Sequence, residues 1–339
     1  MGVTLRARTV AALALVMWSV GCADRSNTYA VEPARTPLES GAPVVLILMP
    51  KNQHTQVVLQ ALAEELTSDF DLVPAWITQE TSVDVLAEVI QQRRPNCIVL
   101  MDTAVRLYAR YQRGVPTSTK HPPALILMAP FAEQVAATLV NATAITYEIP
   151  SVVQFVTLRS MLARPIRRVG VVYRTPLTSF VEKQRVLAAP EHFELVGVEV
   201  PGEPIKDQVA DAVARLYEAN VADCIWILND SALLTPDLIS SVWLPLTTRG
   251  RHMPILVGVS SLLSGNAKLG SFAMLPDHAS LGVQAADLIF ELAEDGWPSV
   301  GERPVGQPRA VRTAVDVSNA RKYFGFREAA ISTIDEVVE

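Results

Sequence analysis

Two stretches of the chain can be laid over one another: RRPNCIVLMDTA (93–104) and NVADCIWILNDSA (220–232). In each, a cysteine opens an apolar run that is followed by an aspartate, a hydroxyl residue and an alanine. Each cysteine lies roughly 55 residues after the first apolar run of its half of the chain. Self-similarity at this distance predicts an internal duplication, so we expect two lobes of the same architecture.

Around these stretches, short apolar runs alternate with amphipathic segments, which is the pattern of βαβ units around a parallel sheet. Expected strands cover 44–49, 70–77, 97–101 and 124–128 in the first half, and 168–173, 193–200, 224–228 and 255–257 in the second. Expected helices cover 55–67, 83–92 and 104–113, and then 179–188, 208–218 and 236–248. The predicted fold class is therefore α/β, with two Rossmann-like lobes built on parallel sheets.

Cys97 and Cys224 take equivalent positions in the two halves, which predicts that both are small core residues of corresponding strands. A disulfide or redox pair is the alternative. We disfavour it, because equivalent positions in separate lobes lie farther apart than a disulfide can span.

Composition excludes several classes of protein. The 339 residues are 50% hydrophobic and 19% charged, which rules out disordered, collagen-like and coiled-coil chains. A net charge of −6 argues against a nucleic-acid partner. The sequence has no GxGxxG, P-loop, HExxH or GxSxG motif, and its histidines lack metal-ligand spacing. We therefore expect no enzyme activity, no cofactor and no metal.

The first residues are typical of an export signal. Arg6 and Arg8 precede an apolar run over 9–20, shorter than the ~20 residues that span a bilayer. Ser-Val-Gly-Cys (19–22) follows at once and resembles the bacterial lipoprotein box, which predicts a signal peptide over 1–21 and a lipid on Cys22. The alternative is an ordinary secretory signal cleaved near Gly21 or Ala23; either way the protein is exported.

The segment 22–42 is polar and contains Pro, Ser and Gly, which predicts a flexible tether between the membrane and a folded body.

Candidate binding residues follow the predicted strands, because ligands of open parallel sheets bind beyond the carboxyl ends of the strands. Helix N-termini at the same edge favour anions. The polar residues at these positions are Asn52, Gln53, His54, Asp102, Thr103, Arg174, Asn229, Asp230 and Ser231. Such residues suit a small polar or zwitterionic solute. The alternative, compatible with the first, is that Asp102, Thr103, Asp230 and Ser231 cap the helices that they precede.

Four further stretches carry a resemblance to a known family. They are ITYEIPSVVQFVTLRSMLARPIRRVGVVYRT (145–175), ADCIWILNDSALL (222–234), LGSFAMLPDHASLGVQAADLIFELAEDG (269–296) and VRTAVDVSNARKYFGF (311–326). They resemble the ABC-transporter substrate-binding proteins of the tryptophan- and tyrosine-binding lipoprotein type. The resemblance extends over 43–328 and is closer in the second half than in the first.

The resemblance implies the type I periplasmic-binding fold, with two lobes joined by three crossovers that act as a hinge. The crossovers are expected near 147–151, 270–275 and 304–312. The N-terminal lobe would contain 43–148 and 275–303, and the C-terminal lobe 149–274 and 304–339.

Family binding positions carry over unevenly. The polar turn after the first strand corresponds to Asn52, Gln53 and His54, and a second turn corresponds to Thr103 and Ala104. In the second half the family's turns correspond to Tyr173 and Arg174, and to Asn229, Asp230 and Ser231. The sequence departs from the family at Ala129, where an aspartate is usual, and this puts the family's amino-acid ligand in doubt.

The function that the resemblance implies is an exported solute-binding lipoprotein. It would capture a small, polar, amino-acid-like solute in the interlobe cleft and deliver it to an ABC-transporter permease, with the membrane contacted through the N-terminal lipid. The alternative is a sensor or assembly lipoprotein that keeps the fold but acts through a membrane partner, with a degenerate cleft.

Overall fold

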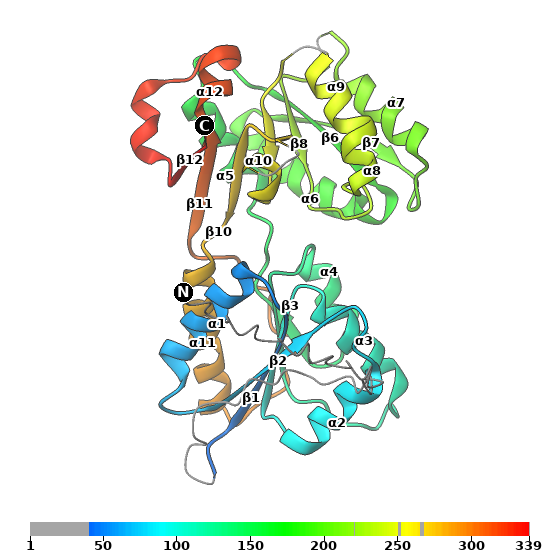
Figure 1. The fold of residues 1–339 in the computed structure, drawn as a ribbon, viewed down its shortest axis with the longest axis vertical. Helices are drawn as coiled ribbons and strands as arrows, with labels where there is room; N and C mark the ends of the chain where they lie inside the picture. Colours follow the sequence, from blue (N-terminus) through cyan, green and yellow to red (C-terminus); the bar gives the residue numbers. More distant parts are fainter. Residues whose placement is uncertain (1–40, 220, 250–251, 265–267, 339) are drawn as a thin grey trace, which may run out of the picture.

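The computed structural model describes residues 41–338, apart from 220, 250–251 and 265–267. Figure 1 shows two lobes, one above the other, each with a central sheet flanked by helices. The predicted signal peptide and Cys22 lie outside the described residues, as does most of the predicted tether. Within the described ranges, no helix combines the length and the apolar character needed to cross a membrane.

The first lobe has a five-stranded parallel sheet in the order β2-β1-β3-β4-β5. Its strands are β1 (Val44–Pro50), β2 (Asp71–Ile77), β3 (Cys97–Met101), β4 (Ala124–Leu127) and β5 (Ala142–Ala144). Its helices are α1 (Gln53–Leu66), α2 (Val83–Arg93), α3 (Ala104–Gly114), α4 (Ala132–Ala136) and α11 (His278–Glu294).

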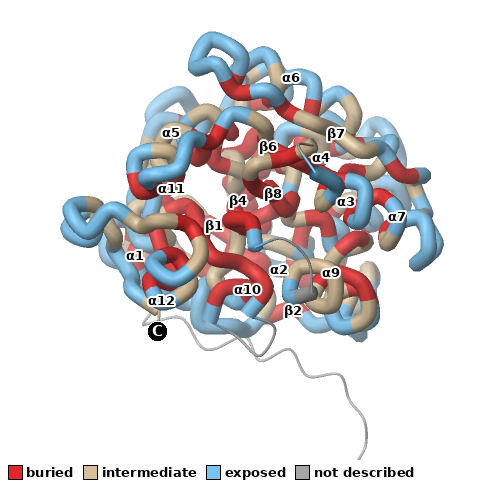
Figure 2. The backbone as a smooth tube through the Cα atoms, turned by 90° about the horizontal axis from the view of Figure 1, so that it is seen from above, coloured by how far each residue is buried: buried red, intermediate tan, exposed pale blue. Residues whose placement is uncertain are grey.

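Strand β1 shows why the sequence of this sheet is apolar without alternation. Leu46 and Leu48 belong to the core under α2 and α3, whereas Val45, Ile47 and Met49 belong to the core under α1 and α11. Both faces of the strand are buried, as is usual for a parallel sheet covered by helices on both sides. Figure 2 shows the buried strands at the centre and exposed helix surface around them.

The second lobe has a seven-stranded sheet in the order β12-β11-β10-β9-β8-β6-β7, in which β10 and β11 are antiparallel and the other neighbours are parallel. Its strands are β6 (Arg168–Arg174), β7 (Glu194–Val200), β8 (Cys224–Ile227), β9 (Ile255–Val257), β10 (Phe272–Pro276), β11 (Val311–Asp316) and β12 (Glu336–Val338). Its helices are α5 (Ser151–Met161), α6 (Thr178–Ala188), α7 (Lys206–Leu216), α8 (Pro236–Leu238), α9 (Leu244–Arg249), α10 (Ser261–Ser264) and α12 (Val317–Asn319). Short 3₁₀ or π segments lie at Thr175–Leu177, Ala189–Glu191, Ile239–Trp243, Ala320–Phe324 and Glu328–Thr333. The predicted fold class, two α/β lobes with parallel sheets, is confirmed.

The two sheets share one strand order. β3 lies between β1 and β4, and β8 lies in the same way between β6 and β9. Cys97 and Cys224 begin these corresponding strands, and both are buried free thiols. Burial raises the pKa of Cys97 to about 12 and also raises the pKa of Cys224. Both thiols are therefore protonated core residues with little reactivity.

The chain passes between the lobes after β5, after β10 and before β11. A parallel bridge between Ile145 and Gly306 holds the first and last of these segments together, and Gly306 N donates to Ala144 O at 2.9 Å. Helix α11 returns to the first lobe and packs across α1. Its Gly282 permits the close approach, because a Cβ there would lie 2.6 Å from Ala61 Cβ.

The helix expected over 236–248 is present but not uniform. A π-helical turn, Ile239–Trp243, separates α8 from α9, and Trp243 is buried with its indole N–H donating to Leu233 O at 2.8 Å. The sequence patterns predicted neither α4, α5 nor β5. α4 is too short to show a period, β5 is Ala-Thr-Ala and so lacks a strongly apolar run, and α5 carries apolar residues around its whole circumference, which hides the helical repeat.

Candidate functional site

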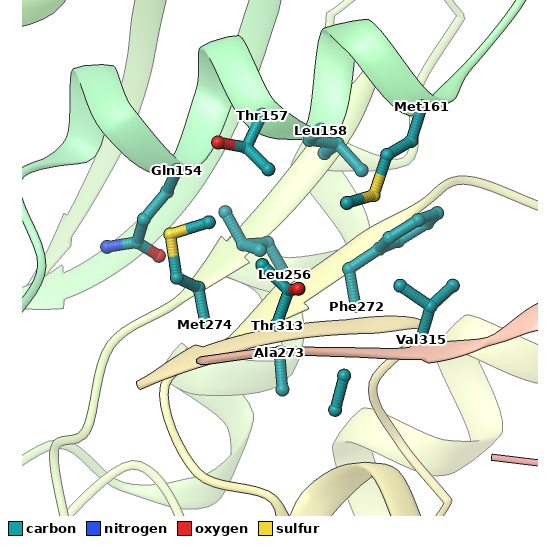
Figure 3. Close-up of a pocket in the computed structure, with 11 residues that line it drawn as sticks. Gln154, Thr157, Leu158, Met161, Leu256, Phe272, Ala273, Met274, Thr313 and Val315 are labelled. Carbon is teal, nitrogen blue, oxygen red and sulfur yellow. The ribbon is translucent and has the colours of Figure 1, made fainter. Parts of the chain in front are cut away.

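A cavity of about 890 Å³ lies between the lobes, which we call the interlobe cavity. Its walls come from the ends of β2, β3 and β4 with α3 and α4 in the first lobe, and from the ends of β6 and β8 in the second. Ligand sites in proteins typically occupy about 300–1,000 Å³. By contrast, the apolar crevice between α5 and the β9-β10-β11 strands (Figure 3) has about 10 Å³, room for roughly one water molecule.

The interlobe cavity brings together candidate residues from both halves of the sequence. The candidates that line it are Asp102, Thr103, Arg174, Asn229, Asp230 and Ser231. They meet because parallel strands end at the same edge of each sheet, and the two lobes turn these edges toward one another.

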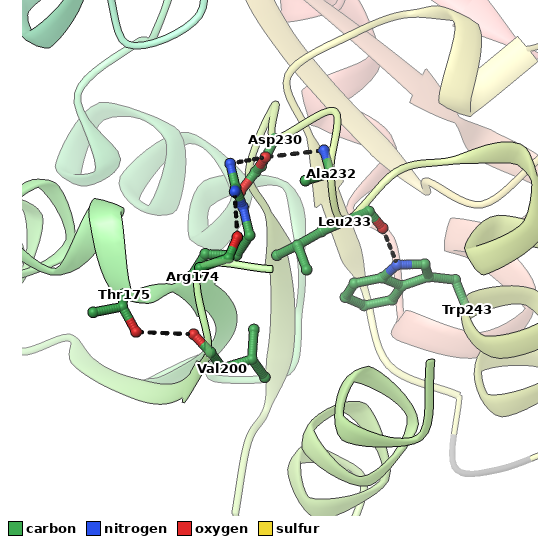
Figure 4. A network of polar contacts seen from close by, with 8 residues as sticks. Arg174, Thr175, Val200, Asp230, Ala232, Leu233 and Trp243 are labelled. Atoms are coloured by element: carbon green, nitrogen blue, oxygen red, sulfur yellow. Dashed lines mark hydrogen bonds and ion pairs between the residues drawn. The ribbon is translucent and has the colours of Figure 1, made fainter. Parts of the chain in front are cut away.

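Arg174 and Asp230 form a bidentate ion pair in the second lobe (Figure 4). Arg174 Nε donates to Asp230 Oδ2 at 2.6 Å, and Nη2 donates to Oδ1 at 2.9 Å. Asp230 also accepts from Ala232 N at 3.1 Å, and Arg174 Nη1 donates to Gly202 O at 2.6 Å. Asp230 is only 3% exposed, so its carboxylate holds the guanidinium at the cavity wall instead of facing solvent.

On the first-lobe side, Asp102 and Thr103 form part of the wall of the interlobe cavity. Burial raises the pKa of Asp102, and the nearby Arg106 guanidinium partly opposes this by lowering it. Asp102 has a φ of 52°, a left-handed conformation that is uncommon outside glycine. Thr103 is the N-cap residue of α3, but its hydroxyl makes no capping hydrogen bond, and the residue is exposed. The Thr103 hydroxyl is thus available to a ligand.

Asn229 contributes an unusual polar atom to the cavity. Its Oδ1 is buried and has no hydrogen-bond partner among the described residues. The side chain fits beside Gly258, where a Cβ would lie 2.6 Å from both Asn229 Oδ1 and Nδ2. A buried amide oxygen without a partner carries a desolvation cost, which a donor on a bound molecule would relieve.

Other candidates lie outside the interlobe cavity. Asn52 caps α1, accepting from Thr55 N at 3.0 Å, a role that the sequence pattern did not assign to it. Gln53 and His54 line a separate cavity of about 340 Å³ beside β10 and β11. Tyr173 is 6% exposed and packs in the core of the second lobe.

His54 belongs to a ring cluster at the hinge. Its imidazole lies 5.0 Å from that of His278, measured between centroids, and Tyr147 Oη lies 3.1 Å from His278 Nε2. Burial and, to a smaller extent, the neighbouring His54 lower the pKa of His278 to about 4. His278 is therefore a neutral hydrogen-bonding partner of Tyr147 at neutral pH.

Side chains of α4 and of the residue before it contact side chains of α6 across the two lobes, beside a further cavity of about 380 Å³. The rings of Phe131 and Phe180 lie 5.2 Å apart, and Lys183 Nζ lies 2.7 Å from Glu133 Oε2. Glu148 lines the same cavity and accepts from Phe131 N at 2.9 Å. Burial raises the pKa of Glu148 to about 7, against a smaller lowering by this hydrogen bond.

Three arginines of α3 also line the interlobe cavity, although the sequence pattern did not identify them as binding residues. Arg106, Arg110 and Arg113 all line the interlobe cavity and are exposed. Their spacing of four and three residues within one predicted helix was the available signal, since it places them on one face. In the part of the chain that the structure describes, no group of three or more His, Cys, Asp or Glu side chains could hold a metal ion.

Two α/β lobes of matching strand order, joined by three connecting segments and with a cavity between them, define the type I periplasmic-binding fold. Comparison with solved structures supports this class. A ligand-free, open substrate-binding protein with adhesive properties from Clostridium difficile has a TM-score of 0.61 at 14% identity, covering 88% of this chain and 99% of that one. An ABC domain from Streptococcus pneumonia in complex with L-Trp has a TM-score of 0.55 at 16% identity, covering 87% and 100%.

A conserved domain protein from Vibrio cholerae is similar to the same extent, with a TM-score of 0.57 at 17% identity over 88% of this chain and 99% of that one. No protein-family model and no curated protein sequence matches the chain. At these identities the likeness shows the fold, and the resemblance inferred from the sequence is confirmed at that level.

Proposed function

We propose that this protein is an exported solute-binding lipoprotein. It captures a small polar solute in the interlobe cavity and delivers it to the permease of an ABC transporter, while a lipid on Cys22 anchors it to the periplasmic side of a bacterial membrane. Neighbours of the same fold support this, since one is named a substrate-binding protein and another contains L-Trp.

The observation that carries the proposal is the composition of the interlobe cavity. Polar groups of the first lobe (Asp102, Thr103) and of the second (Arg174, Asn229, Ser231) line the same space. A solute that contacts both walls stabilises the closed arrangement of the lobes more than the open one, and this difference in affinity drives closure. The proposed mechanism needs no chemical step.

The roles follow from the contacts. Arg174 is the cation that meets an acidic group of the solute, and Asp230 is its positioning residue. The Thr103 and Ser231 hydroxyls, both exposed, offer hydrogen bonds from opposite lobes. The carboxamide of Asn229 pairs its free oxygen with a donor on the solute.

A titration tests solute capture. The purified protein is mixed with amino acids and other small solutes while tryptophan fluorescence and melting temperature are followed. We expect saturable binding that Thr103→Ala and Ser231→Ala each weaken by roughly threefold to tenfold, the loss of one hydrogen bond. Ser160→Ala, an exposed serine on α5 away from the cavity, should bind as the unaltered protein does.

The alternative, a sensor or assembly lipoprotein with a degenerate cleft, makes the opposite prediction. In that case no solute changes fluorescence or melting temperature, while a membrane partner is still recovered with the protein. That pair of results would refute solute capture.

Cys22 is tested separately, by growing cells with a labelled fatty acid and comparing the protein with a Cys22→Ser variant. We expect the label and the membrane association to be present in the unaltered protein and lost in the variant. An unlabelled, released protein would instead indicate ordinary secretory cleavage near Gly21 or Ala23.

A further inference from the structure

One wall of the interlobe cavity carries a line of positive charge. Arg106, Arg110 and Arg113 on α3 lie four and three residues apart, which places them on the same face of the helix. All three are exposed, and all three line the interlobe cavity. We call these residues the α3 arginine stripe.

Few negatively charged side chains lie near the α3 arginine stripe. Arg106 lies near Asp102, whose pKa it lowers against the stronger effect of burial. Among the described residues, neither Arg110 nor Arg113 has an ion pair or a side-chain hydrogen bond. Like charges one helical turn apart repel each other, so the stripe gains stability when an anion lies beside it.

The charges around the interlobe cavity do not balance. Four arginines line it, the stripe and Arg174, against two aspartates, Asp102 and Asp230, which leaves 4 − 2 = +2. The whole chain, by contrast, has a formal net charge of −6. A cleft whose charge is opposite to that of the whole protein concentrates ions of the other sign, here anions.

An ammonium group finds little to bind in this cavity. The carboxylate of Asp230 is already satisfied by Arg174 and by Ala232 N. At the end of β4 the wall is Ala129, which offers no charge. Asp102 is the remaining acid of the lining, and it is half-buried beside Arg106.

Resting on the proposed function, we propose that the solute is an anion with at least two acidic groups, carboxylate or phosphate. One group meets Arg174 on the second lobe, and another meets Arg110 and Arg113 on the first. The guanidinium groups of Arg110 and Arg113 suit both kinds of acid, because their parallel N–H donors match two oxygens of a carboxylate or a phosphate. Arg174, whose Nε and Nη2 already bind Asp230, offers its remaining Nη protons. A solute that bridges the two walls in this way also supplies the contacts that close the lobes.

Calorimetric titration of the purified protein with matched probes tests the inference. The pairs are succinate and succinamide, glutamate and glutamine, and fructose 1,6-bisphosphate and fructose. We expect an acidic member to bind at least about tenfold more tightly than its neutral or less charged partner, with affinity falling as NaCl is added. The carboxylate and phosphate arms of the panel distinguish the two acids.

The double variant Arg110→Gln/Arg113→Gln should weaken binding of that acidic probe by about tenfold or more. Both residues are exposed, so its melting temperature should stay close to that of the unaltered protein. Arg215→Gln, an exposed arginine on α7 that does not line the cavity, is the matched control and should bind normally.

Two results would count against the inference in different ways. If neutral members bind as tightly as acidic ones, or if the double variant binds unchanged, the anion inference fails while solute capture stands. If no probe and no other small solute binds at all, the proposed function fails, and the anion inference fails with it.

Discussion

At the level of single residues, Arg174 and Asp230 show how one side chain can fix the position of another. The aspartate is nearly fully buried, and three donors from Arg174 and Ala232 satisfy its oxygens. The arginine keeps 23% of its side chain exposed, on the side of the interlobe cavity. The pair therefore fixes a cation at the cavity wall, and breaking it should affect folding as well as binding.

We expect Asp230→Ala to lower the free energy of unfolding by about 1–3 kcal/mol, because it leaves the partly buried guanidinium of Arg174 without its carboxylate. Chemical denaturation measures the change. The exposed pair of Arg159 and Glu191 is the control, and Glu191→Ala should cost less than about 1 kcal/mol. Equal losses in the two variants would contradict a special role for the buried pair.

Residue type alone left the use of the strand-end side chains open. Asn52 and Thr103 both precede helices and both can act as caps. In the structure Asn52 caps α1, whereas the Thr103 hydroxyl is not used by α3. Backbone conformation makes the difference: Asn52 is extended, while Thr103 is already helical, so its hydroxyl is not directed at the free N–H groups of the first turn.

At the level of helices and strands, the predictions were best where an element is a continuous apolar run buried on both faces. Strand β3 begins and ends where its apolar run does. β5 was missed because Ala-Thr-Ala is not a strongly apolar run, whereas the equally short β9 was predicted from Ile-Leu-Val, and the five residues of α4 show too little of a helical period. The packing of α11 on α1 is a relation between distant segments that neither segment's own pattern reveals.

The contact of α1 with α11 depends on Gly282, so we expect Gly282→Ala to destabilise the protein by about 1–3 kcal/mol. A Cβ there would lie 2.7 Å from Val58 O, a backbone atom that cannot rotate away. Denaturation measures the loss. Gly301→Ala is the control, since nothing lies within 4 Å of its Cβ position. A Gly282→Ala protein as stable as the control variant would show that the two helices can separate without cost.

At the level of the whole molecule, the hinge side carries ionisable groups whose pKa values are shifted by burial. Glu148 lies on the first crossover and lines the cavity between α4 and α6. Burial raises its pKa from 4.5 to about 7, so the folded protein holds this proton where the unfolded chain releases it. The stabilising effect of Glu148 is therefore full below about pH 4.5 and is lost as the pH rises through about 7.

We expect the unaltered protein to lose about 1–3 kcal/mol more stability between pH 5 and pH 8 than Glu148→Gln, which has no proton to release. Urea denaturation at the two pH values measures this difference. His278, whose pKa is lowered to about 4, acts in the opposite direction as its unfolded form protonates below about 6.5. Its contribution is the same in both proteins and cancels. Parallel pH dependences would contradict a protonated Glu148.

The order of apolar runs in the chain was sufficient for the fold class, because strands buried on both faces must be apolar throughout and parallel strands must alternate with helices. The same order placed Asp102, Thr103 and Asn229 at strand ends. Tertiary structure alone decided which of these side chains share a cavity, since the lobes face each other through contacts between segments far apart in sequence. In the tertiary structure His54 lies at the hinge and Tyr173 in the core, and the α3 arginines line the same cavity as Arg174.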